Sequence, residues 1–139
     1  MEQEPKNLLA EIGRMNQEEK SMQEKNLLFR NLNSAYQWLF ASYRTETFKR
    51  KGLDDSTVES LFKTYQLDSV FDSADLIPGD ERLSFSGIHA AYQLQSLIFF
   101  LEKDFASSTD LIDKVIALWE ERPDRIRDNP RPYRNLLAN

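Results

Sequence analysis

Residues that interrupt helices are scarce in this chain. The 139 residues include four glycines and five prolines, and no proline lies between Pro5 and Pro78. Proline breaks a helix interior because it has no amide hydrogen to donate and clashes with the preceding turn, and an interior glycine costs about 1 kcal/mol relative to alanine. Long stretches are therefore free to be helical, and we expect an all-α fold.

The chain length and its apolar content allow one core. Hydrophobic residues make up 40% of the 139 residues, with nine Phe, five Tyr and two Trp among them. That is enough apolar volume for one core and too little chain for two, so we expect a single helical domain over residues 1–139. The chain contains no cysteine, which excludes disulfides, thiolate metal ligands and cysteine nucleophiles.

Charge and the distribution of apolar residues argue against nucleic-acid and membrane partners. The net charge of −5 gives no general attraction to polyanions or anionic lipid. Charged residues interrupt Met1–Arg14, which therefore lacks the apolar segment of a signal peptide. The longest apolar run, Leu97–Leu101, is far shorter than the roughly 20 residues that span a bilayer. We expect a cytoplasmic protein with no nucleic-acid partner and no membrane segment.

Residues 1–25 are predicted to form an N-terminal helical arm. Apolar residues lie at helical spacing between Leu8 and Met15, and the polar run Asn16–Ser21 separates them from Met22. Three arrangements fit this pattern. The arm is one long helix with the segment that follows, a helix with a break, or an arm that docks on another chain.

Residues 26–82 are predicted to form a first helical hairpin and a loop. An apolar stripe of helical period predicts a helix that ends near Lys51-Gly52, where glycine can adopt the left-handed cap. The members of this stripe are Leu28, Leu32, Tyr36, Leu39 and Tyr43. A short amphipathic helix follows, with N-cap candidates at Asp54–Ser56. Residues 67–82 contain many Asp and Ser residues with Pro and Gly, which predicts a loop.

The most apolar segment of the chain is Phe85–Lys103, which is apolar over nearly its whole circumference. A helix of this kind is buried on all sides, so we expect it at the centre of the fold. Ser84 or Ser86 is placed to cap its first turn. The segment opens a second hairpin that we expect over residues 83–139.

Two more helices are expected after this segment. Thr109 is predicted to cap a helix over Asp110–Arg122, and Pro123 to end it. A last helix is predicted to restart at Asp128–Pro132, and its amphipathic pattern is unfinished at Asn139. The pattern predicts about five to six helices in all. Because the last amphipathic pattern is unfinished, we expect the chain to be a fragment of a longer repeat protein.

The spacing of large and small residues in the second hairpin follows a repeating plan. An aromatic, a small and an aromatic residue come at steps of four and three. Before the second helix comes another aromatic, with a small residue three later and then large apolar positions. These residues are Tyr92, Ser96, Phe99, Phe105, Ser108, Ile112 and Val115. Pro123 closes the unit, and Lys103 stands where the turn usually has glycine. The segment resembles the tetratricopeptide-type (TPR-like) hairpin, especially the divergent repeats of large uncharacterised bacterial proteins.

This resemblance implies both a fold and a class of function. It implies antiparallel helical hairpins in a right-handed stack, in which the small residues let two helices approach. It also implies non-catalytic binding of a protein or peptide on the concave face. The candidate partner-binding residues, which interrupt the apolar central helix, are His89, Tyr92, Gln93 and Gln95. A structural interpretation stands beside this one, with His89 as an isolated polar residue and Tyr92 as part of the core.

Two other functions stay open on the residues alone. The arm and the unfinished helix at Tyr133–Leu137 could bury their apolar faces in another copy, which would make the protein a homodimerisation or assembly element. An enzyme would need an unrecognised acidic site, formed by Asp72, Asp75, Asp80 and Glu81. No phosphate-binding loop, paired-histidine zinc helix or nucleophile elbow occurs. We therefore expect an interaction scaffold with no catalytic residue, no cofactor and no metal.

Overall fold

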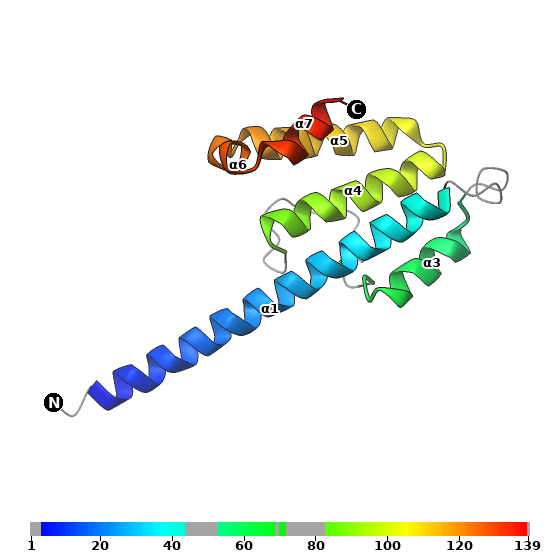
Figure 1. Cartoon of the computed structure of the whole chain (residues 1–139). Coiled ribbons are helices and arrows are strands. Elements are labelled where there is room, and N and C mark those ends of the chain that lie inside the picture. Colours follow the sequence, from blue (N-terminus) through cyan, green and yellow to red (C-terminus); the bar gives the residue numbers. More distant parts are fainter. Residues whose placement is uncertain (1–3, 44–52, 69, 72–82, 139) are drawn as a thin grey trace.

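The computed structural model describes residues 4–43, 53–68, 70–71 and 83–138. Its helices, in chain order, are α1 (Glu4–Tyr43), α3 (Asp55–Thr64), α4 (Phe85–Leu101), α5 (Phe105–Glu120), α6 (Pro123–Asp128) and α7 (Pro130–Ala138) (Figure 1). All regular secondary structure in these residues is helical, which confirms the predicted all-α class.

The N-terminal arm and the long stripe that follows it belong to one helix. α1 runs for 40 residues without a break, which is about 60 Å at 1.5 Å per residue. The polar run Asn16–Ser21 continues the helix because Gln, Glu and Lys are good helix formers in water. Every described side chain from Asn7 to Glu24 is exposed, so this part projects from the body of the protein (Figure 1). The predicted end near Lys51-Gly52 lies outside the described residues.

Helix α4 lies at the centre of the body, packed between α1 and α5 (Figure 1). Nine of its 17 residues are buried, as expected of a helix that is apolar nearly all round. The side chains with almost no exposed surface come from several helices, with Leu32 and Leu39 from α1, Leu94 from α4 and Val115 from α5. The N-cap of α4 is Ser84, whose hydroxyl accepts a hydrogen bond from a backbone amide in the first turn. The prediction of a central helix is confirmed.

The short helix α3 begins where the sequence predicts. Asp54 is its N-cap, and its carboxylate accepts hydrogen bonds from the backbone amide of Thr57 at 2.8 Å and from the hydroxyl of the same residue at 2.6 Å. Leu61 anchors the helix in the core. Most of the predicted loop, residues 72–82, lies outside the described residues.

The turn between α4 and α5 is tighter than the sequence predicts. Helix α5 begins at Phe105 with Asp104 as its N-cap, so the prediction that Thr109 caps a helix from Asp110 was wrong. The carboxylate of Asp104 accepts hydrogen bonds from the amide of Ser107 at 3.2 Å and from its hydroxyl at 2.7 Å. Asp and Thr are both good N-cap residues. The earlier cap adds more than a turn of helix that packs on α4.

Pro123 does more than end α5. It lies in the first turn of α6, a short helix that was not predicted, where the missing amide hydrogen of proline costs nothing. Helix α7 begins at Pro130, inside the predicted restart, and packs on α5 through the buried Leu136. The last helix therefore covers one side of α5.

Replacing Lys103 with glycine is expected to stabilise the protein. Lys103 has a φ of 66°, in the left-handed region that costs a non-glycine residue roughly 1 kcal/mol. Because glycine also loses more freedom on folding, we expect Lys103→Gly to raise the free energy of unfolding by about 0.5 kcal/mol in urea denaturation. Lys103→Ala keeps the backbone penalty and is the matched control. Equal stabilities of the two variants would contradict the prediction.

Candidate functional site

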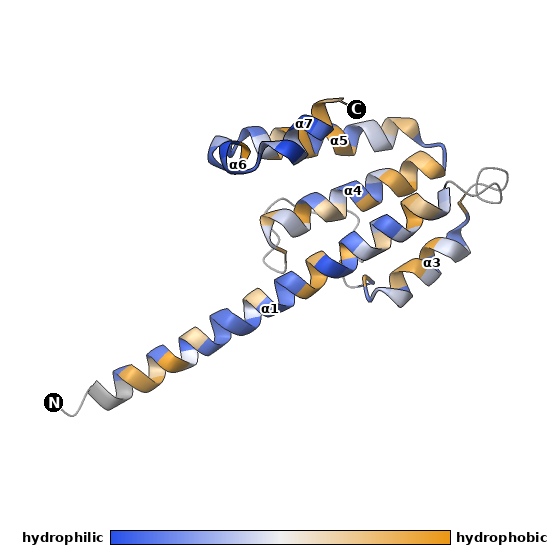
Figure 2. Ribbon diagram, in the orientation of Figure 1, coloured by the Kyte–Doolittle hydropathy of each residue, from blue (hydrophilic) through white to orange (hydrophobic). Residues whose placement is uncertain are grey.

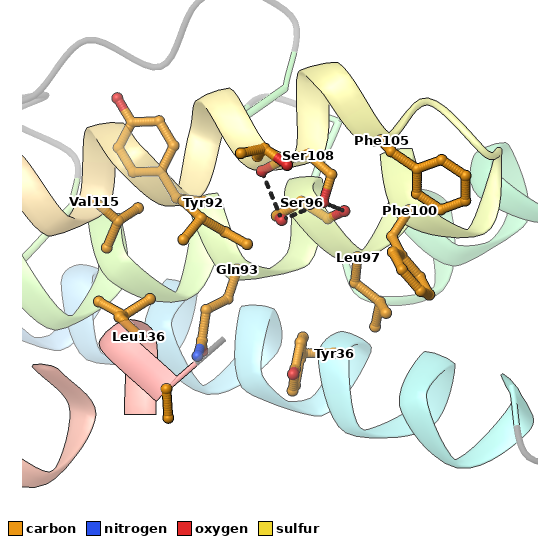
Figure 3. A pocket seen from close by; sticks show the side chains of 13 residues that line it. Tyr36, Tyr92, Gln93, Ser96, Leu97, Phe100, Phe105, Ser108, Val115 and Leu136 are labelled. Atoms are coloured by element: carbon orange, nitrogen blue, oxygen red, sulfur yellow. Dashed lines mark hydrogen bonds between the residues drawn. The ribbon is translucent and has the colours of Figure 1, made fainter. Parts of the chain in front are cut away.

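A groove of about 580 Å³ opens between α1, α4, α5 and α7 (Figure 3). Its walls bring together residues from both halves of the chain, including Tyr36 of α1, Gln93, Leu97 and Phe100 of α4, Phe105 and Ile112 of α5, and Leu136 of α7. The groove forms because α7 returns along α5 and because α1 and α5 lie on two sides of α4. This volume and its lining make it a candidate site for a ligand or a peptide segment.

The described residues that line this groove carry no charge. They are apolar or aromatic, with hydroxyl and amide groups from residues such as Tyr36, Gln93 and Thr109. Burial raises the pKa of Tyr36 above its ordinary value, so its hydroxyl stays neutral at physiological pH. A site of this kind favours an uncharged, largely apolar ligand that accepts or donates a few hydrogen bonds.

Aromatic side chains cluster in and beside the groove, and three of them, Phe40, Phe100 and Phe105, are exposed. The Phe100 ring meets Phe105 edge to face at 5.3 Å between centroids and Tyr43 at 6.2 Å, and Tyr36 stacks on Phe40 at 6.0 Å. We call these five residues the aromatic rim. Phe100 is 43% exposed and Phe105 is 55% exposed. Clustered, exposed aromatic residues are the commonest anchors of protein interfaces.

Two serines bring α4 and α5 into close contact beside the groove. The hydroxyl oxygens of Ser96 and Ser108 lie 2.8 Å apart, and each is also within hydrogen-bond distance of the carbonyl oxygen of the other residue, at 3.2 Å and 3.0 Å (Figure 3). The two hydroxyl hydrogens are shared among these three contacts. Both serines are buried, and their polar atoms are satisfied by one another. The close approach that the sequence analysis expects of these small residues is therefore present, and it fixes the positions of the two helices that form the groove.

The four predicted binding residues lie in different surroundings. Gln93 is half-buried and Tyr92 is buried, and both line the groove. Gln95 is half-buried on α4 and is not one of the residues that line it. His89 also lies outside the groove, against α5. The structure thus brings two of the four together and separates the other two.

His89 makes a structural contact with Trp119. The indole Nε1–H of Trp119 donates a hydrogen bond to His89 Nδ1 at 2.9 Å, and the two rings are perpendicular with centroids 5.6 Å apart. Because Nδ1 accepts this bond, the neutral imidazole carries its hydrogen on Nε2. Burial lowers the pKa of His89 to about 4. The histidine therefore joins α4 to α5 as a neutral ring.

Phe100 and Phe105 are rim residues that the sequence does not single out as binding candidates. In the sequence, Phe105 is one position of the hairpin repeat, and Phe100 is one member of the apolar run Leu97–Leu101. The sequence held no clear signal for Phe105, because it placed the start of this helix at Asp110, beyond that residue, whereas the helix begins at Phe105 itself.

Other candidate sites offer less. A smaller hollow of about 350 Å³ lies between α1 and α3 and includes Trp38, Ser56 and Thr64 among its lining residues. Within the described part of the chain, no group of three His, Cys, Asp or Glu residues could hold a metal ion, and no helix is long and apolar enough to cross a membrane. The four acidic residues of the enzyme hypothesis lie outside the described residues.

No protein-family model, curated protein or solved structure matches the chain. The groove and the exposed arm are the features of the described residues that indicate a function.

Proposed function

We propose that the protein is a non-catalytic protein–protein interaction scaffold of the TPR-like type, and that its groove binds an apolar helix or peptide of a protein partner. The observation that carries this proposal is the uncharged groove with its aromatic rim. Phe100 and Phe105 are exposed although they are among the largest apolar residues of the chain. A partner that covers them removes this apolar surface from water, which favours binding.

The lining residues indicate the kind of segment that fits. An amphipathic helix presents apolar anchors at spacings of three, four and seven residues, and such anchors fit a groove of this volume and composition. No charged lining residue loses hydration when the groove fills. Gln93 and Tyr36 would orient the segment through hydrogen bonds, and the rim would supply most of the binding energy.

The proposal keeps part of the residue set that the sequence favours. Gln93 stays as a polar contact, and Tyr92 stays as a buried wall of the groove. His89 and Gln95 are no longer among the proposed contact residues. Phe100 and Phe105, which are exposed and belong to the rim, are added to the set. A cytoplasmic location, a bacterial source and a place among divergent TPR-like proteins belong to the same proposal and follow from the sequence patterns.

Replacing Phe105 with glutamate is expected to abolish partner capture. The change removes a rim aromatic and brings a charge into an uncharged groove, which should weaken binding by at least about tenfold. The experiment is affinity capture from native lysate with quantitative mass spectrometry, in parallel with circular dichroism to show that the variant is folded.

Ala117→Glu is the matched control for this capture. Ala117 is exposed on the same helix and is not one of the residues that line the groove, so the variant has the same added charge and should capture the partner as the wild type does. Equal capture by the wild type and both variants would exclude the groove as the binding site.

The exposed arm of α1 favours a second candidate function, self-assembly. The arm has apolar residues that no other part of the described chain covers.

A further inference from the structure

The projecting half of α1 has an apolar tip. Leu8 is 59% exposed, Ile12 is 45% exposed and Met15 is 58% exposed. They lie at positions i, i+4 and i+7, the spacing with which a helix anchors itself in a groove. Figure 2 shows this tip in hydrophobic colours, separated from the body by a mostly hydrophilic stretch. The tip is therefore suited to insertion at a second surface.

A seven-residue repeat connects the tip to the groove. Large apolar or aromatic residues recur at every seventh position of α1, at Leu8, Met15, Met22, Phe29, Tyr36 and Tyr43. The first three are exposed on the arm, Phe29 is half-buried on the body, and Tyr36 lines the groove. A seven-residue repeat favours left-handed pairing with another helix. The five members from Leu8 to Tyr36 are evenly spaced about Met22, so two identical helices that cross there in opposite directions bring these five side chains of each copy together.

We propose that the arm binds a second copy of this chain, with the two α1 helices antiparallel and centred on Met22. In this arrangement Met22 meets its own counterpart, Met15 meets Phe29, and Leu8 meets Tyr36 at the edge of the groove. Each copy therefore places its apolar tip against the groove of the other. This inference rests on the proposed role of the groove as a helix-binding site, and it names the helix.

The length of α1 excludes binding of the tip to the groove of its own chain. Leu8 and Tyr36 are 28 residues apart on one continuous helix, which separates them by about 42 Å. Because the helix has no break, the arm cannot fold back (Figure 1). A second molecule is the partner that presents both a matching repeat and a groove.

The charges beside the repeat favour the antiparallel direction. When the helices run antiparallel about Met22, Glu18 of one copy lies beside Lys25 of the other, and symmetry makes this pair twice. In a parallel pair in register, each residue lies beside its own counterpart, so Glu18 would face Glu18 and Lys25 would face Lys25. Like charges at such positions are destabilising. The antiparallel pairing therefore brings Glu18 and Lys25 together, whereas the parallel pairing does not.

The first test is the mass of the full chain in solution by sedimentation velocity. We expect a dimer for the wild type and at least a tenfold weaker dimer for Met22→Glu, which places two like charges at the centre of the pair. Met22 is 63% exposed, so the monomer should fold unchanged. Gln23→Glu adds the same charge outside the repeat and should dimerise as the wild type does. A strictly monomeric wild type overturns the inference.

The second test reads the direction of pairing from disulfide cross-links. The chain has no cysteine, so single substitutions report single positions. We expect Met22→Cys to cross-link with itself under mild oxidation, Leu8→Cys to cross-link with Tyr36→Cys in a mixture, and Leu8→Cys alone not to cross-link. Efficient cross-linking of Leu8→Cys with itself would indicate parallel helices and would overturn the inference.

These outcomes are separable from failure of the groove as a binding site. A monomeric wild type that captures a different protein in a Phe105-dependent manner overturns the inference and leaves the proposed function standing. The opposite outcome is that the dimer shows the expected cross-links and that Phe105→Glu changes neither the dimer nor the capture of partners from lysate. This outcome overturns the proposed function and leaves the antiparallel pairing standing.

Discussion

Replacing Leu94 with alanine is expected to lower the free energy of unfolding by about 3 kcal/mol, because the change leaves a cavity in a closely packed core. Leu94 has no exposed surface and lies on the central helix α4. Domains of this size are stable by only about 5–15 kcal/mol, so the loss would be a large fraction of the total. The measurement is urea denaturation followed by far-ultraviolet circular dichroism.

Leu27→Ala is the control for this core substitution. Leu27 is also on a helix but is 55% exposed, so the same chemical change should alter stability by less than about 0.5 kcal/mol. A loss below about 1 kcal/mol for Leu94→Ala would mean that α4 does not form the centre of the core.

Lowering the pH is expected to destabilise the protein through His89. The folded state holds the pKa of His89 at about 4, whereas an unfolded histidine titrates near pH 6.5. Between these values the unfolded chain binds a proton that the folded chain does not. Stability is therefore complete above about pH 6.5, falls as the pH drops toward 4 and levels off below it. The loss due to this group is at most about 3 kcal/mol.

The comparison with His89→Gln isolates this contribution from the titration of carboxylates. The glutamine amide can still accept a hydrogen bond from Trp119 but does not titrate, so the difference in stability between the two proteins should change between pH 6.5 and 4. Because His89 is the only histidine of the chain, its proton resonances also give its pKa directly in an NMR titration. A pKa near 6.5, or parallel stability curves, would contradict the prediction.

Local chemistry explains why most helices could be predicted. Ser84 and Asp54 cap α4 and α3 as expected, because capping depends on a side chain and a backbone amide three residues later. The central position of α4 was also predictable, since a helix that is apolar nearly all round has to be buried. The sequence could not choose between one long helix and a broken arm, because exposed polar residues at Asn16–Ser21 are compatible with both.

The start of α5 shows where local reasoning fails. Asp104 and Thr109 are both acceptable N-caps, and the choice depends on what the helix packs against. Starting at Phe105 places Ser108 inside α5, where it meets Ser96 of α4 at 2.8 Å. It also requires Lys103 to take a left-handed conformation that sequence patterns disfavour. Packing between two helices outweighs a backbone cost of about 1 kcal/mol at a single residue.

The residues of the candidate site were also only partly predictable from the sequence. The sequence selects four residues on the central helix as binding candidates, and two of them, Tyr92 and Gln93, line the groove. The aromatic rim could not be predicted, since Tyr36 and Phe105 are far apart in the chain and meet across the groove only when α1, α4 and α5 are packed. The sequence favours His89 as a polar contact for a partner. In the structure its hydrogen-bonding partner is the indole of Trp119, thirty residues away in the chain.

The all-α class, the central apolar helix and a short set of cap candidates for α3 and α4 follow from the sequence alone, because each depends on side chains within a few turns of one another. Only the tertiary structure decided which aromatic residues stay exposed, that two serines fix the approach of α4 and α5, that His89 is held neutral, and that the arm projects from the body. These depend on contacts between distant segments, and the packing that creates such contacts leaves no local pattern in the chain.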